Sequence, residues 1–195
     1  MRQSKLSRKT QETQIDIALK LDGRGEAEIS TGIGFLDHML TLFAKHSGID
    51  LKIQSEGDLV VDGHHTAEDT GIVLGQVVAR ALGDKKGIER YGHAIIPMDE
   101  ALLEAVIDLS GRPYIVFHAD FNAPLVGDFD TQLTEEFFRA FAFNAGITLH
   151  LSCRYGRNDH HIIEGMFKAC ARALRQAIRI DQANADRIPS TKGVL

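Results

Sequence analysis

The stretch His64-His65-Thr66-Ala67-Glu68 recurs as His160-His161-Ile162-Ile163-Glu164, and each copy begins an apolar run with helical spacing. We call these the first and second His-His-x-x-Glu motifs. Imidazole nitrogens and carboxylate oxygens bind divalent metals such as zinc, manganese and iron. On a helix the glutamate lies on the same side as both histidines, but adjacent histidines point about 100° apart. Each motif is therefore suited to giving one imidazole to each of two metal ions.

The repeat extends beyond the motifs. A predicted helix and an alternating strand precede each one, and Gly48 and Gly146 occupy equivalent places 98 residues apart. The order helix, strand, turn, metal-binding helix thus occurs twice, which indicates an internal duplication. We predict an α/β (α+β) fold that forms one compact domain, residues 1–195, from two similar halves, about 1–92 and 93–195. Each half is expected to be a small, mostly antiparallel sheet backed by two helices, with the helices packed between the two sheets.

One pair of strands is predicted ahead of the first helix in each half. Residues 13–21 alternate in polarity and end at Asp22-Gly23, a hairpin signal that would join them to residues 26–30. In the second half, the apolar residues 100–109 and the β-branched residues 113–119 would pair around Ser110-Gly111-Arg112-Pro113.

A site for two metal ions needs more ligands than the two motifs supply. The duplication nominates His38, ten residues before Gly48, and Glu136, ten residues before Gly146. Both side chains are ligand types, although an exposed glutamate at the start of a helix is also common. A second group of residues carries donors suited to a phosphate, and each of them alone could equally be an exposed surface residue: Arg90, Arg112, Lys168, Ser190 and Lys192.

Composition excludes several classes of protein. The net charge of −5 and the lack of a basic stripe argue against nucleic-acid binding. No apolar run approaches the roughly 18 residues of a membrane span, and the N-terminus lacks a signal peptide. Cys153 and Cys170 form neither a CxxC motif nor a disulfide framework, and Cys170 is expected in the core. We therefore expect a soluble, cytoplasmic protein.

Several motifs in order resemble the imidazoleglycerol-phosphate dehydratase family of histidine biosynthesis, in its monofunctional form. They are Gly34-Phe35-Leu36-Asp37-His38-Met39, Asp62 to Asp69, Pro97-Met98-Asp99-Glu100-Ala101, Asp108 to Pro113, and the second His-His-x-x-Glu motif. The resemblance runs from about Arg8 to the terminal segment 190–195. It implies removal of water from D-erythro-imidazoleglycerol phosphate to give imidazole acetol phosphate. It also implies two Mn²⁺ ions per active site and a homo-oligomer of 24 subunits with sites shared between chains.

The resemblance also assigns residues. The metal ligands would be His38, His64, His65, Glu68, His160, His161 and Glu164, and the phosphate contacts would be Arg90, Arg112, Lys168, Ser190 and Lys192. Glu12 matches the glutamate that reaches the hydroxyl region of the substrate. At the position of Glu136 family members often carry histidine, but Mn²⁺ also accepts carboxylate oxygen, so Glu136 stays a candidate ligand.

The chemistry of the reaction restricts the mechanism. The proton lost from carbon 2 is not next to a carbonyl, so the imidazole of the substrate must take up the electrons. We expect a metal-bound imidazolate, then a diazafulvene-like intermediate after loss of the carbon-3 hydroxyl. The candidates for moving protons are Glu164, Glu68 and Glu12, in that order. Two alternatives stay open: a dinuclear metal-dependent phosphoester hydrolase, and a non-enzymatic protein whose metals join subunits.

Overall fold

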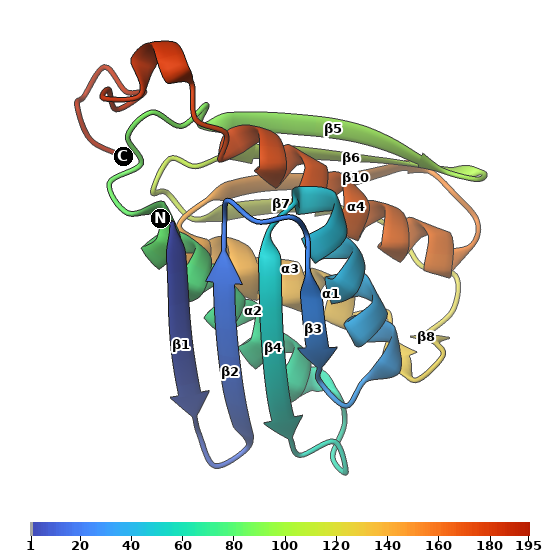
Figure 1. Ribbon diagram of the computed structural model, residues 1–195. Helices are drawn as coiled ribbons and strands as arrows, with labels where there is room; N and C mark the ends of the chain where they lie inside the picture. The colour runs from blue at the N-terminus through green and yellow to red at the C-terminus, as the bar shows by residue number, and fades with distance from the viewer. Residues whose placement is uncertain (1) are drawn as a thin grey trace.

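Two four-stranded sheets enclose a layer of helices in the computed structural model, which describes residues 2–195 (Figure 1). The first sheet has the order β1-β2-β4-β3 and the second has the order β5-β6-β10-β7, so the two halves share one topology. Only β3–β4 and β7–β10 are parallel pairs. The strands are β1 (Gln3–Lys9), β2 (Thr13–Lys20), β3 (Ala27–Ser30), β4 (Asp50–Gly57), β5 (Tyr91–Met98), β6 (Ala101–Asp108), β7 (Tyr114–His118), β8 (Leu125–Val126), β9 (Phe129–Asp130) and β10 (Thr148–Tyr155).

The four helices connect the halves. Helix α2 packs on β1 and β2, and α4 packs on β5 and β6, while α2 also contacts α3 and α1 contacts α4. The predicted duplicated fold, with helices between two sheets, is therefore confirmed. Within residues 2–195, none of the helices has the length and apolarity that crossing a membrane requires. The helices are α1 (Gly34–Ser47), α2 (His64–Leu82), α3 (Leu133–Ala145) and α4 (Asp159–Ala177), followed by a 3₁₀ turn at Gln182–Asn184.

Alternation of polarity builds the inner face of each sheet. In β2, Ile15 and Ile17 point inward and are fully buried, and in β6 Leu103 and Ile107 do the same. Successive side chains of a strand point to opposite faces, so the intervening residues face outward. The aromatic rings of Phe138 and Phe167, among others, fill the space between the helices, with centroids 4.6 Å apart. Cys170 is buried in this core, as predicted.

The two predicted strand pairs are wrong. Strand β2 pairs with β1 and β4 rather than with residues 26–30, which contain β3 at the far edge of the sheet. The loop after Asp22-Gly23 is held by Asp50, whose Oδ1 accepts hydrogen bonds from the backbone N–H of Arg24 and of Glu26. This anchor carries the chain to β4 and so places β3 beside it. An alternating pattern identifies the buried face of a strand but not its neighbour.

The second half repeats this difference. Strand β6 pairs with β5 and β10, whereas β7 lies parallel to β10 on its other side. The segment around Ser110 to Pro113 is therefore a crossover to the edge of the sheet and not a hairpin turn. The outermost strands β1 and β5 were absent from the predicted elements.

Close contact between α2 and α3 depends on two glycines. A Cβ built on Gly71 would lie 2.6 Å from the carbonyl oxygen of Phe137, and one on Gly75 would lie 2.6 Å from that of Phe141. Real Cβ atoms do not approach a backbone oxygen this closely, so only glycine lets the two helices pack at this distance. The contact joins the first half of the chain to the second.

The variant Gly75→Ala tests this packing. We expect it to lower the free energy of unfolding by about 1–3 kcal/mol, because the added methyl group must push α3 away. Gly34→Ala is the matched control, since nothing lies within 4 Å of its new Cβ. Urea denaturation followed by circular dichroism at one protein concentration compares them. Equal unfolding midpoints for the two variants would contradict the role of Gly75.

Candidate metal centre

Both His-His-x-x-Glu motifs lie in the first turn of a helix. Helix α2 begins at His64 and α4 begins at Asp159, one residue before His160. The Asn158 side chain caps α4 by accepting hydrogen bonds from the backbone N–H of His160 and of His161. In each motif the two imidazole rings are nearly perpendicular, at 86° in the first and 83° in the second, with centroids 6.2 Å apart. The adjacent histidines therefore diverge as the helical geometry predicts.

His38, His160 and Glu164 form one cluster of possible metal ligands. The Nε2 of His160 lies 3.1 Å from Glu164 Oε2, and the Nε2 of His38 lies 3.4 Å from the same oxygen. One ligand atom from each of the three residues lies within 4.8 Å of the others. His38 comes from α1 and the other two from α4, so the contact between these helices assembles the cluster. The Phe35 ring packs edge-on against His160 and covers one side.

Glu164 is the buried member of this cluster, with only 6% of its surface exposed. Burial by itself raises the pKa of its carboxyl group. The Lys168 ammonium, 2.5 Å from Oε1, together with His160 and His38, outweighs that effect, so the pKa lies below its ordinary value. Glu164 therefore stays ionised at neutral pH, as a metal ligand must.

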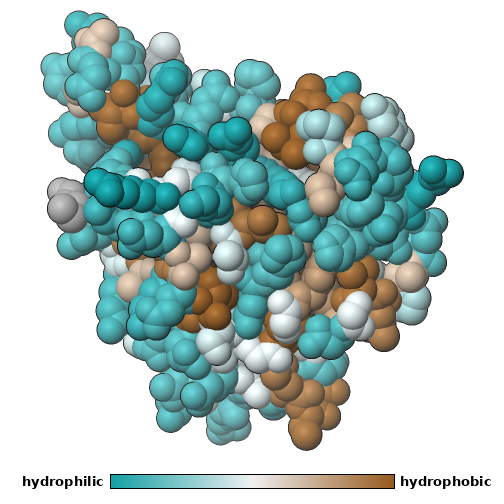
Figure 2. Space-filling view, turned by 45° about the vertical axis from the view of Figure 1, so that its right-hand side comes forward, coloured by the Kyte–Doolittle hydropathy of each residue, from teal (hydrophilic) through white to brown (hydrophobic). Residues whose placement is uncertain are grey.

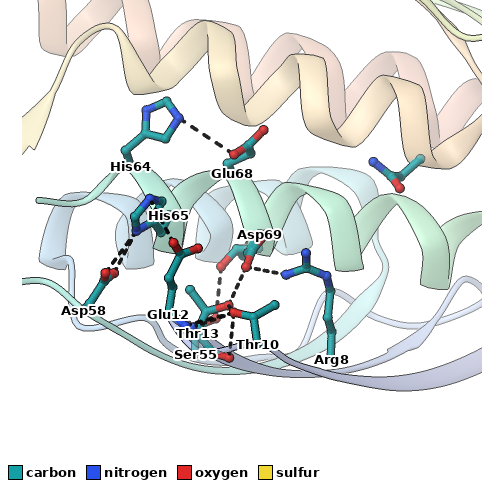
Figure 3. A network of polar contacts seen from close by, with 12 residues as sticks. Arg8, Thr10, Glu12, Thr13, Ser55, Asp58, His64, His65, Glu68 and Asp69 are labelled. Carbon is teal, nitrogen blue, oxygen red and sulfur yellow. Dashed lines mark hydrogen bonds and ion pairs between the residues drawn. The ribbon is translucent and has the colours of Figure 1, made fainter.

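The glutamate of the first motif, drawn in Figure 3, is more exposed than that of the second: 43% of the Glu68 side chain is exposed against 8% for Glu164. His64 Nε2 lies 3.8 Å from Glu68 Oε2. His65 Nδ1 lies 3.1 Å from both carboxylate oxygens of Asp58, and its Nε2 lies 3.8 Å from Glu12 Oε1. The hydrogen bond with Asp58 raises the pKa of His65 above its ordinary value.

The second motif holds its second histidine in the same way. His161 Nδ1 lies 2.7 Å from Glu100 Oε2, and the Nε2 lies 3.7 Å from Asp99. The contact with His161 is the largest of the effects that lower the pKa of Glu100 to about 2. When Nδ1 of His65 and of His161 donates to these carboxylates, the neutral ring keeps the lone pair of Nε2 for a metal ion. Sequence reasoning missed these two carboxylates, although Glu100 lies within a quoted motif.

Glu136 does not join the cluster within one chain. It lies on α3, and its carboxylate is 3.9 Å from the guanidinium of Arg139. Among residues 2–195, the three-residue cluster of His38, His160 and Glu164 is the one group with metal-ligand geometry. The role of Glu136 as a metal ligand equivalent to His38 thus stays a prediction from its position in the repeat.

The predicted phosphate contacts divide between two places. Lys168 lies beside Glu164, whereas Arg90 forms an ion pair with Asp108 and donates to the carbonyl of Pro189. Arg112 also approaches Asp108, and the Ser190 hydroxyl accepts from the backbone N–H of Lys192. The backbone N–H of Arg90 bonds to Ala177 at the end of α4. Helical geometry puts Ala177 about 20 Å from Glu164. One chain therefore does not gather all five donors.

Comparison with known proteins identifies relatives over the full chain. Residues 31–174 match the family model described as imidazoleglycerol-phosphate dehydratase. A protein of that name from Gluconobacter oxydans is 57% identical over 194 residues, covering 100% of this chain and 98% of the relative. One from Lactococcus lactis subsp. lactis is 59% identical over 196 residues, covering 98% of each.

Solved structures agree with the sequence relatives. The Staphylococcus aureus imidazoleglycerol-phosphate dehydratase superposes with a TM-score of 0.83 at 46% identity, covering 91% of this chain and 98% of the other. The Pyrococcus furiosus structure, solved in complex with (S)-C348, gives 0.84 at 36% identity, covering 97% and 100%. Family, length and fold thus coincide, as the motifs predicted. The chain belongs to the imidazoleglycerol-phosphate dehydratase family of hydro-lyases.

Proposed function

We propose that this chain dehydrates D-erythro-imidazoleglycerol phosphate to imidazole acetol phosphate in histidine biosynthesis, with two Mn²⁺ ions per active site. The main support for the proposal is the cluster of His38, His160 and Glu164, whose ligand atoms lie within 4.8 Å of one another. Membership of the dehydratase family supplies the reaction.

The donor set fits Mn²⁺. It combines imidazole nitrogen with carboxylate oxygen, and the carboxylate stays ionised. Carboxylates at Asp58 and Glu100 fix the rings of His65 and His161 through Nδ1 and so leave each Nε2 free to bind metal. Histidines that ligate metals are usually held in this manner. We therefore assign His38, His64, His65, Glu68, His160, His161 and Glu164 as ligands, with Glu136 as a candidate for the same role.

When bound to the imidazole of the substrate, Mn²⁺ would act as a Lewis acid that lowers the pKa of the ring N–H. The chain must then move protons. Glu164 suits this task poorly, because Lys168, His160 and His38 already contact its two carboxylate oxygens. The Glu12 side chain is 55% exposed, and within residues 2–195 its carboxylate accepts no hydrogen bond. We thus place Glu12 first for proton transfer and keep Glu164 as a ligand.

Sharing of the site between chains accounts for two features. Arg90 and Ser190 lie too far from Glu164 to meet one small substrate within a single chain. Large apolar side chains also stay exposed near the first motif, where Val60 is 99% exposed, and apolar areas interrupt the polar surface in Figure 2. Exposed apolar patches commonly mark contacts between proteins. We propose a 24-subunit homo-oligomer in which neighbouring chains bring together Lys168 and the remaining phosphate donors Arg90, Arg112, Ser190 and Lys192.

Product analysis tests the proposed reaction against the hydrolase alternative. The purified protein is incubated with Mn²⁺ and the imidazoleglycerol phosphate substrate. We expect an unhydrolysed keto-phosphate, detected by mass spectrometry, and no inorganic phosphate. Release of inorganic phosphate would favour the dinuclear hydrolase instead.

Glu164→Gln tests the ligand assignment. We expect Mn²⁺ to bind at least about tenfold more weakly, because even groups that only orient a metal ligand contribute that much. Electron paramagnetic resonance of free Mn²⁺ measures the affinity. Glu135→Gln, at a partly exposed residue of α3 that pairs with Arg139, is the control. If metals merely joined subunits, saturating Mn²⁺ would restore full kcat to Glu164→Gln, and that result would contradict a catalytic site.

Glu100→Gln tests whether the carboxylate orients His161. The glutamine amide is uncharged and holds the Nδ1–H of His161 less firmly than the carboxylate does. We therefore expect the Mn²⁺ affinity to fall about 10- to 100-fold. Glu104→Gln is the matched control, because it lies on β6 four residues after Glu100 but pairs with Arg154. Titration calorimetry with Mn²⁺ compares the variants. Equal affinities would show that Glu100 serves only the fold.

A further inference from the structure

Asp69 is a buried carboxylate that the proposed reaction does not use. It follows Glu68 directly on α2, and only 7% of its surface is exposed. Its Oδ2 accepts a hydrogen bond from the Thr13 hydroxyl and pairs with the guanidinium of Arg8 (Figure 3). A charge held out of water costs free energy unless it is well paired. The position of Asp69 between α2 and the first sheet therefore suggests a role beyond packing.

The partners of Asp69 lie on either side of the turn that carries Glu12. Arg8 belongs to β1, and Thr13 begins β2. Within the turn, the Thr10 hydroxyl accepts hydrogen bonds from the backbone N–H of Glu12, at 3.1 Å, and of Thr13, at 3.0 Å. These contacts tie the turn to Thr13 and, through its hydroxyl, to α2.

The main chain of Glu12 is also held from the other side. Its carbonyl oxygen accepts a hydrogen bond of 3.1 Å from the backbone N–H of Asp58. Asp58 is the residue that fixes His65. The backbone N–H and C=O of Glu12 are thus both held, while its carboxylate accepts no hydrogen bond within residues 2–195 and lies 3.8 Å from His65 Nε2.

The second half lacks this arrangement. Ala101 begins β6 as Thr13 begins β2, and Gly165 takes the place of Asp69 after the second motif. There the side chain of the turn residue Glu100 is itself held, since Oε1 accepts from the backbone N–H of Arg157 and of Asn158. The repeated fold therefore does not require the buried Asp69. The arrangement occurs in the half whose turn glutamate has a free carboxylate.

We propose that Asp69 is a positioning residue that, through Thr13, holds Glu12 at the reacting part of the substrate. This proposal rests on the role of Glu12 in the proposed function. Because the main chain of Glu12 is fixed, its carboxylate can reach only a small region. The carboxylate oxygens themselves stay available to bond to the substrate. Rates of proton transfer depend on such placement, because a displacement of about 1 Å can lower a rate by about 100-fold.

Thr13→Val removes the hydroxyl at nearly constant volume and leaves Asp69 paired with Arg8. We expect kcat to fall at least about tenfold, since Glu12 loses its fixed position, with KM and Mn²⁺ binding unchanged. Thr13→Ser, which keeps the hydroxyl, should restore kcat. Thr70→Val is the matched control, because it removes another buried hydroxyl contact between α2 and the sheet, 3.0 Å from Ser55, and should leave kcat unchanged.

A double-mutant cycle with Glu12→Gln separates the two proposals. If Asp69 and Thr13 act through Glu12, Thr13→Val should cause no further loss of kcat in the Glu12→Gln background. Two results would overturn the positioning role and leave the proposed function intact. In the first, the kcat losses of the two single variants multiply in the double variant. In the second, Thr13→Val has a normal kcat although Glu12→Gln has a low one. A normal kcat for Glu12→Gln would instead overturn the role of Glu12, and the positioning proposal with it.

Discussion

The packing of α1 against α4 is the contact on which the candidate metal centre depends. It brings His38, from the first half of the chain, to His160 and Glu164 in the second. The two halves cannot separate without dispersing this cluster. The glycine-mediated contact of α2 with α3 holds the halves together in the same way. The helices between the sheets therefore supply both the core and the positions of the ligands.

Much of this arrangement could be predicted from the sequence, because the duplication repeats whole elements. The helix starts at both motifs, the divergence of adjacent histidines and the layer of helices between two sheets follow from periodicity and helical geometry. Strand pairing did not follow, because alternation defines which face of a strand is buried and says nothing about its neighbour. The Asp50 anchor that carries the chain to β4 is a contact between distant residues. Asp58 and Glu100 were missed for the same reason.

The duplicated halves have diverged, so that equivalent glutamates have different surroundings. Glu164 is buried and paired with Lys168, whereas its counterpart Glu68 is open to solvent. Glu100 is committed to His161 and to two backbone N–H groups, whereas its counterpart Glu12 keeps a free carboxylate. A ligand for a metal must stay ionised, while a group that transfers protons must be able to exchange them. We propose that this asymmetry leaves Glu12 available for proton transfer and keeps Glu164 and Glu100 in fixed positions at the candidate metal centre.

Anomalous scattering at the manganese edge, from crystals with a bound substrate analogue, tests the account most directly. The account predicts two strong peaks a short distance apart, each contacted by one histidine from each His-His-x-x-Glu motif, with His38 and Glu164 among the ligands. A single peak, or two peaks that both lie away from Glu164, would contradict a centre with two metal ions built from the duplicated motifs.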